Sequence, residues 1–294
     1  MDKNTVRTVV RSFYSIQKLR IEVGNRLVAS IRVRLGQDPG TKTEEMPEEA
    51  KKLLEEVAVE YKRVTDGLVT EESFSKILRA AKRQGTLVYS SEKELARLYT
   101  MLKEEESRLE KLLEAMVSQH PLWDAFLKDV RGCGPLMAAV ILSEFDIYKA
   151  RYPSSFWKYA GLDVAPDGRG RGRYPEHLVK VKYINSKGEE AEKLSITFNP
   201  FLKTKLIGVL GPSFLRAGGY YAQIYRDYRH RLDTHPAHKD KTKAHKHAMA
   251  VRYMVKMFLL DLWLAWRELE GLPLTLPYHT AKLGIVHSGA VKIG

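Results

Sequence analysis

The sequence predicts a mostly α-helical protein with a helical N-terminal scaffold that includes a coiled-coil-like helix. A helix–hairpin–helix-containing α domain with a small β-hairpin insertion is expected to follow. Three features predict this fold class: long segments with apolar residues three and four positions apart, a Gly-Cys-Gly-Pro turn between apolar segments, and one pair of alternating segments. We expect the scaffold at residues 1–119, the helix–hairpin–helix domain at 120–272 and a tail at 273–294.

The N-terminal scaffold is expected to contain four helices. The first spans residues 4–35, a stretch without Pro. Its apolar residues at helical spacing are Val6, Val9, Val10, Phe13, Ile16 and Leu19. The second begins at Pro47 with acidic residues in its first turn and runs to about Thr65, and the third begins near Thr70. Gly85 precedes the fourth helix, at about 90–119.

The fourth helix has a heptad pattern of leucines, interrupted at Glu105. The a and d positions are occupied by Leu95, Leu98, Leu102, Leu109, Leu112 and Met116. Three arrangements remain open. Residues 91–117 form a helical hairpin arm or a homo-oligomeric coiled coil, or they pack as a bundle helix within the chain. About three heptads are too few to decide between them.

The later elements include the predicted hairpin domain and its β insertion. One helix is expected to end at Val130 and the next to begin at Pro135. Residues 178–184 and 193–198 alternate on either side of a Ser-Lys-Gly turn, which predicts a β-hairpin. The remaining elements are helices at about 200–210 and 214–232, a basic, His-rich loop at 233–247 and a buried helix at 248–270.

Positive charge is concentrated in the middle of the chain. The net charge is +13, and residues 131–260 hold 23 Lys+Arg against 11 Asp+Glu, whereas residues 1–130 hold 23 against 22. Affinity for a nucleic-acid backbone grows with each cation that contacts a phosphate. We therefore expect DNA, or structured RNA, as the partner.

Composition also excludes several classes of protein. The single cysteine, Cys133, excludes an internal disulfide framework and a Cys-rich zinc module. No apolar run reaches the ~20 residues of a membrane span. The first residues lack the apolar region of a secretory signal. We therefore expect a cytoplasmic protein that does not enter a membrane.

The turn between the two hairpin helices is the first candidate phosphate-binding site. Gly132 and Gly134 would let the backbone approach a phosphate, and the free N–H groups at the start of the next helix would meet its oxygens. Arg131 would add a charge-assisted contact. Such contacts hold the backbone without reading the bases. The alternative is an ordinary turn between two helices.

A Gly/Arg stretch at residues 167–173 is the second candidate. Its alternating Gly and Arg predict a mobile, cationic loop suited to a groove or a single strand, or else a solvated flexible loop. The nucleic-acid-binding cations expected outside the turn are Lys149, Arg151, Arg169, Arg171, Arg173, Lys203 and Lys205.

The histidines and tyrosines that precede the last helix have several interpretations. Four histidines lie between His235 and His247, but the surrounding lysines oppose a dication, so we expect no metal site there and a phosphate-facing or solvated loop instead. Four tyrosines at residues 220–228 could stack bases or supply a recombinase nucleophile. An aromatic seam that packs against the tryptophan-bearing helix is favoured over both.

The segments VRGCGPLMAAVILSEF and PSSFWKYAGLDVAP carry a family resemblance. The motif residues are Gly132, Gly134, Pro135, Ala138, Ala139, Ile141, Leu142, Glu144, Tyr159, Gly161 and Leu162. This pattern resembles the C-terminal transposase domain of the insertion-sequence one-hundred-and-ten family, which is related to the Piv invertase. The Asn199-Pro200 block and the last helix are also similar, so the resemblance covers roughly residues 120–272. It implies DNA strand exchange.

The chain also departs from that family. It begins with helices, so we expect the metal-binding carboxylates of the family's RuvC-like domain to be absent, and no cofactor is evident unless catalysis requires Mg²⁺. The residues after Leu162 contain no serine where the family has its nucleophile. Ser195 is the substitute candidate, with Lys193, Lys203 and Lys205 as sources of positive charge. The alternative, an ordinary strand residue, is favoured for Ser195.

Three functions follow from these observations. The first is a DNA-binding transposase or site-specific recombinase, whose enzymatic activity stays open. The second is a non-catalytic protein, derived from such a transposase, that binds DNA or structured RNA. The third is an oligomeric interaction scaffold built on the heptad helix.

Overall fold

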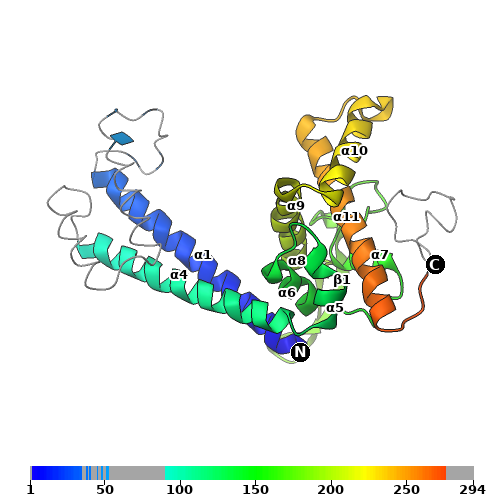
Figure 1. Ribbon diagram of the computed structural model, residues 1–294, viewed down its shortest axis with the longest axis horizontal. Coiled ribbons are helices and arrows are strands. Elements are labelled where there is room, and N and C mark those ends of the chain that lie inside the picture. The colour runs from blue at the N-terminus through cyan, green and yellow to red at the C-terminus, as the bar shows by residue number, and fades with distance from the viewer. Residues whose placement is uncertain are drawn as a thin grey trace. The chain divides into compact units, whose positions relative to one another are not determined.

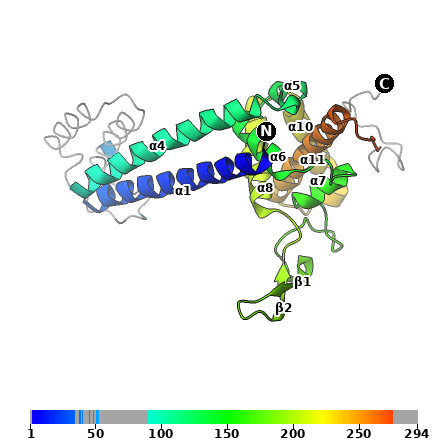
Figure 2. The same cartoon turned by 90° about the horizontal axis from the view of Figure 1, so that it is seen from below.

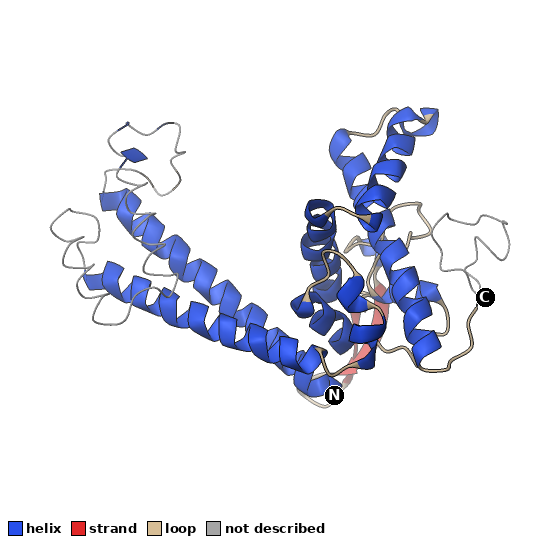
Figure 3. Cartoon of the chain, viewed as in Figure 1, coloured by secondary structure: helices blue, strands red, loops and turns tan. Residues whose placement is uncertain are grey.

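The computed structural model describes residues 2–34 and 90–275, together with residues 38, 40, 45, 48, 51 and 52. The protein is mostly α-helical with one small antiparallel β-hairpin, which confirms the predicted fold class (Figure 3). Most of the helix expected from Pro47, the helix expected from near Thr70 and the tail beyond residue 275 fall outside the described residues.

The chain divides into two compact units. The N-terminal unit comprises Thr8–Leu113, and the C-terminal unit comprises Met1–Arg7 with Glu114–Gly294. The N-terminal unit contains most of α1 (Lys3–Arg34) and α4 (Ser90–Val117), which lie side by side (Figure 1, Figure 2). The bounds of α1 agree with the predicted helix at 4–35.

Polar contacts show that α1 and α4 are antiparallel. The Arg20 guanidinium lies 2.5 Å from a Glu106 carboxylate oxygen and donates to the Tyr99 hydroxyl at 2.7 Å. Further along α1 and further back along α4, the Ser30 hydroxyl donates to Glu92 at 3.3 Å. The heptad helix therefore packs against a helix of its own chain.

The buried positions of α4 only partly follow the expected heptad. Leu102 and Leu109 are buried, but Leu98 and Leu112 are 40% and 38% exposed, and Ala96 and Leu113 are buried instead. The side of α4 that faces α1 carries Tyr99 and Glu106, which contact Arg20, and the buried Leu113. This line lies one residue after the line of Leu98 and Leu112 that the heptad predicts. Homo-oligomer formation through residues 91–117 stays a prediction.

The C-terminal unit is built around two apolar helices. Its helices are α5 (Pro121–Ala125), α6 (Pro135–Glu144), α7 (Pro153–Tyr159), α8 (Pro200–Lys205), α9 (Gly211–Ala217), α10 (Tyr220–Thr234) and α11 (Lys243–Leu269). Helix α11 contacts α5, α7, α9 and α10, and α6 contacts α8. Every residue of α6 from Met137 onward is buried. The predicted buried helix at 248–270 is thus confirmed as the centre of this unit.

Several element boundaries differ from the prediction. The helix expected to end at Val130 ends at Ala125 and is followed by a 3-10 turn, Leu127–Asp129. The helix expected over 214–232 is interrupted at Gly218 and Gly219, whose φ values of 70° and 83° are incompatible with an α-helix. A π-helical turn, Leu206–Leu210, joins α8 to α9.

The predicted His-rich loop at 233–247 is shorter than expected. Helix α11 begins at Lys243, because the Thr242 side chain accepts a hydrogen bond from the His245 N–H at 3.2 Å and caps the helix. Helices α10 and α11 form a helical hairpin, joined by a short 3-10 turn, Pro236–His238 (Figure 1).

The β-hairpin consists of β1 (Val179–Ile184) and β2 (Glu190–Ser195), paired antiparallel with Val179 opposite Ser195. It projects away from the helices of the C-terminal unit, as Figure 2 shows. All six residues of β1 are exposed, so this insertion adds little to the core.

Candidate nucleic-acid interface

The two glycines of the predicted phosphate-binding turn have different roles in the structure. Gly132 has a φ of 90°, and a Cβ added there would lie 3.0 Å from the Ser213 carbonyl oxygen. Gly134 is the exposed N-cap of α6, with a φ of −76° and open space around the position of a Cβ. Gly132 is therefore needed for packing, whereas Gly134 leaves the start of α6 accessible to a ligand.

A cavity of about 520 Å³ lies beside this turn. Its lining includes Phe126, Arg131, Tyr220 and the glycine pair that precedes α10. Arg131 is exposed, and its Cδ would be 3.4 Å from a Cβ added at Gly219. Neither α6 nor α10 has a side-chain cap or an acidic residue in its first turn. The turn therefore combines a cation with two helix starts that favour an anion.

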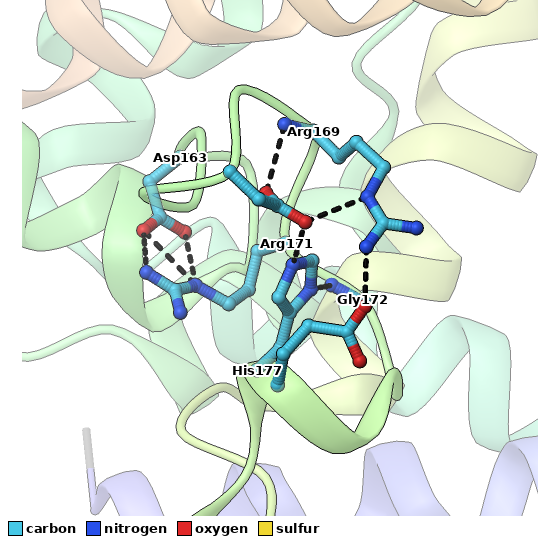
Figure 4. Close-up of polar contacts among 7 residues, drawn as sticks. Asp163, Arg169, Arg171, Gly172 and His177 are labelled. Atoms are coloured by element: carbon cyan, nitrogen blue, oxygen red, sulfur yellow. Dashed lines mark hydrogen bonds and ion pairs between the residues drawn. The ribbon is translucent and has the colours of Figure 1, made fainter.

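The Gly/Arg stretch is an ordered turn, which differs from the mobile loop that its composition predicts (Figure 4). Arg171 donates to one Asp163 carboxylate oxygen through Nη2 at 2.7 Å and through Nε at 3.1 Å. Its backbone N–H donates to the Asp163 carbonyl at 3.0 Å. Arg169 pairs with Asp167 at 2.6 Å and also with Glu176. Carboxylates of the same segment thus compensate both guanidinium charges.

The His177 side chain is buried within this turn and links two parts of it. Its side chain is 1% exposed, and its Nδ1 accepts a hydrogen bond from the Gly172 N–H at 3.0 Å. The proton of the neutral ring therefore lies on Nε2, which donates to Asp167 at 3.0 Å. The Arg169 backbone N–H, together with His177, holds the pKa of the Asp167 carboxyl well below its usual range. The sequence did not predict this role of His177, because its partners Gly172 and Asp167 lie five and ten residues before it and form no recognisable motif with it.

The other predicted cations do not gather at one site. Arg173 is exposed, and Lys149 lies 3.6 Å from Asp146 in an exposed pair. The Arg151 guanidinium lies 5.6 Å from the Tyr152 ring centroid, and the Lys205 ammonium lies 5.4 Å from that of Phe201.

A second group of cations, which sequence reasoning missed, surrounds Asp163. Lys203, Arg252 and Lys256 are each partly buried, and burial lowers the pKa of all three side chains. Of these, only Lys203 was predicted to bind nucleic acid. Arg252 and Lys256 were hidden within the apolar pattern of α11, although their spacing of four residues places them on one face. We call Lys203, Arg252 and Lys256 the cation cluster.

Ser195, the candidate nucleophile, is the last residue of β2 and is only partly exposed. Within residues 2–34 and 90–275, no hydrogen bond joins its hydroxyl to a base. The lysines proposed to assist it have other contacts: Lys193 lies 4.7 Å from the Tyr183 ring centroid, and Lys203 donates to the Arg171 carbonyl. The structure does not bring these residues together into a catalytic group.

The histidines near the α10–α11 turn have structural contacts. The His235 and His238 ring centroids are 5.7 Å apart, and His247 Nδ1 lies 2.7 Å from the Tyr225 hydroxyl. No group of three or more His, Cys, Asp or Glu side chains that could hold a metal occurs among the described residues.

The tyrosines of α10 form part of an aromatic seam with α11. Tyr228 stacks on Tyr253 with centroids 4.1 Å apart, and Tyr221 contacts Phe258 at 5.4 Å. The favoured seam is therefore present, although its partners in α11 are these residues and not the tryptophans.

Three of the motif residues that carry the family resemblance meet in one hydrogen-bond network. The Asn199 amide donates to the buried Glu144 carboxylate at 2.6 Å and to the Tyr159 hydroxyl at 3.2 Å. The Asn199 side-chain oxygen caps α8 by accepting the Leu202 N–H at 3.1 Å. These residues come from α6, α7 and the start of α8, so the network joins three elements of the C-terminal unit.

Comparisons of the chain with protein-family models, with curated proteins and with solved structures gave no match. No helix within the described ranges has the length and apolar character that a membrane span requires.

Proposed function

We propose that this protein binds nucleic acid through the sugar–phosphate backbone, using its C-terminal unit. The observation that carries this proposal is the excess of positive charge on the α10–α11 hairpin. Residues 220–256 contain nine Lys+Arg and five His against three Asp. Of these carboxylates, Asp233 is ion-paired with both Arg229 and Lys246. Most of the remaining cations are therefore available to displace counterions from a phosphate backbone.

The turn beside this hairpin supports the same proposal. Arg131 and the uncapped start of α10 line a single cavity, which Asp129 also lines, and the exposed Gly134 begins α6 three residues after Arg131. A phosphate there would meet a guanidinium and backbone N–H groups, which hold the backbone but do not read sequence. DNA and structured RNA both offer this chemistry, so binding is proposed for both.

The test is binding of a fluorescent duplex DNA and a fluorescent RNA hairpin to the full chain, measured by anisotropy at several salt concentrations. The logarithm of the association constant is expected to fall steeply with the logarithm of salt, with a slope of about −0.9 per phosphate contact on duplex DNA. Arg131→Ala is expected to reduce the magnitude of this slope by about one unit, independently of the DNA sequence.

Arg108→Ala is the matched control, because Arg108 is exposed in the N-terminal unit and paired with Glu105 at 2.7 Å. It is expected to leave the slope unchanged. Failure of both nucleic acids to bind at about 50 mM salt would refute the proposal. A chain that self-associates with increasing concentration and ignores nucleic acid would support the scaffold function instead.

DNA strand exchange is a second candidate, favoured by the network of Glu144, Tyr159 and Asn199, because these are motif residues of the resembled transposase domain. An active protein would nick or join supercoiled DNA that carries the ends of such an element, in the presence of Mg²⁺. If no product forms and Ser195→Ala changes nothing, the protein binds nucleic acid without strand exchange.

A further inference from the structure

The cation cluster is not balanced by nearby carboxylates. The charge of Asp163 partly opposes the lowering of the pKa of Lys203, Arg252 and Lys256, but its carboxylate already accepts hydrogen bonds from Nε and Nη2 of Arg171. One carboxylate thus faces four cations. Among the described residues, no ion pair links a member of the cation cluster to a carboxylate within 4.0 Å, and the sequence beyond Glu270 contains no Asp or Glu.

The backbone holds the cluster in place. A Cβ added at Gly170 would lie 1.5 Å from Arg252 Nη1, so the guanidinium rests directly on the Gly/Arg turn in space that a side chain would fill. Lys203 donates to the Arg171 carbonyl, which fixes its ammonium beside the same turn. The ion pairs of Arg169 and Arg171 therefore order the turn against which the cation cluster packs.

Two aromatic rings, one from α7 and one from the segment before α8, border the cluster. The Lys256 ammonium lies 4.3 Å from the Trp157 ring centroid, and the Trp157 indole N–H donates to the Lys256 carbonyl at 3.1 Å. The Lys203 ammonium lies 4.7 Å from the Phe198 ring centroid. These rings exclude water from one side of each ammonium, and they offset only part of the cost of burying it.

Mutual repulsion within the cluster adds to that cost. After burial, the charge of Arg252 is the next cause that lowers the pKa of both Lys203 and Lys256. An anion with several acceptor oxygens would reduce the repulsion and accept hydrogen bonds from the free N–H donors. Phosphate has this chemistry, and Lys and Arg together are its usual ligands in proteins.

We propose that Lys203, Arg252 and Lys256 form a binding site for a phosphate group. The proposal depends on the proposed function in one respect, which is the molecule that bears the phosphate group. If the protein binds nucleic acid, that group is a phosphate of the nucleic-acid backbone. It is separate in sequence from the Gly132–Pro135 turn, and it gives the C-terminal unit a second, preordered phosphate contact.

The first experiment compares thermal unfolding of the full chain in inorganic phosphate and in chloride at equal ionic strength. At about ten times the dissociation constant, phosphate is expected to raise the Tm by about 3–6 °C. Arg252→Gln and Lys256→Met should abolish this rise. Both are also expected to unfold no earlier than the wild type in chloride, because each removes a repelled cation. Lys18→Met, at a side chain 80% exposed in the N-terminal unit, should retain the full rise.

A second measurement needs no folded variant. In the wild-type protein labelled with ¹⁵N-lysine, phosphate should shift the ammonium signals of Lys203 and Lys256 and leave that of Lys18 in place. Equal Tm values in phosphate and chloride, with no shift of these two signals, would overturn the site.

Duplex DNA separates the site from the proposed function. If both Arg252→Gln and Lys256→Met keep the wild-type affinity and salt slope, the nucleic-acid function stands and a backbone phosphate is overturned as the ligand of this site. If phosphate stabilises the protein through these residues but no nucleic acid binds, the site stands with a soluble phosphate compound as ligand, and the nucleic-acid function fails.

Discussion

Substitution of each glycine in the Gly132–Pro135 turn by alanine tests the two roles that the structure gives them. Gly132→Ala places a side chain at a φ of 90°, which costs about 1–2 kcal/mol. The new Cβ would also lie 3.0 Å from both the Ser213 carbonyl oxygen and Phe214 Cδ1. Because one of these atoms belongs to the backbone, relief requires a shift of about 1–2 kcal/mol. We expect a total loss of about 2–4 kcal/mol.

Gly134→Ala is the matched control for stability. Its φ of −76° suits alanine, and no atom lies within 4 Å of the added Cβ. The loss of the preferred N-cap glycine and the reduced entropy of the unfolded chain largely cancel, so the free energy of unfolding should change by less than about 1 kcal/mol.

The assay is thermal unfolding followed by circular dichroism, together with DNA anisotropy. Gly132→Ala is expected to lower the Tm by about 5–15 °C. Gly134→Ala should retain the wild-type Tm but weaken DNA binding about three- to tenfold, since its methyl group obstructs the start of α6. A wild-type Tm for Gly132→Ala would refute the packing role. Undiminished DNA binding by Gly134→Ala would refute the approach of a phosphate at this turn.

Three further predictions concern a buried carboxyl group, the Gly/Arg turn and the packing of the N-terminal unit. Burial raises the pKa of Asp261 to about 6, so the folded state binds a proton that the unfolded state has lost, and the free energy of unfolding should fall by about 3 kcal/mol as pH rises from about 3 to about 7. Asp261→Asn should remove this dependence in a pH series of urea titrations. His177→Ala should cost about 2 kcal/mol and speed amide exchange in the Gly/Arg turn, and unchanged exchange would show that the ring does not order it. Leu109→Ala should cost about 2–3 kcal/mol whereas Leu112→Ala costs less than about 1, and equal losses in urea titrations would contradict the packing of α4 on α1.

The fold class was predictable because long helices leave a strong periodic signal. The apolar spacing in residues 4–35 and 248–270 reports which side of each helix is buried, and burial of that side stabilises the helix. Boundaries were less predictable where a single side chain or backbone angle decides them. The Thr242 cap extended α11 into the predicted loop, and the φ values of Gly218 and Gly219 interrupted a predicted helix.

The candidate site was predictable only where charge and local motif coincide. Arg131 and Gly134 keep the exposure that their motif suggested. Arg169 and Arg171 looked equally available in the sequence, but their charges are compensated by carboxylates that the turn brings back to them. The cation cluster could not be predicted from local composition, because Lys203 lies far in the sequence from Arg252 and Lys256 and only the fold brings them together.

The most direct test of backbone binding by the C-terminal unit is amide hydrogen exchange of the full chain with and without saturating duplex DNA. We predict that DNA slows exchange at residues 131–137, 199–206 and 218–258, and that residues 8–34 and 90–113 exchange at unchanged rates. Slower exchange confined to the N-terminal unit, or no change anywhere with DNA bound, would contradict the account.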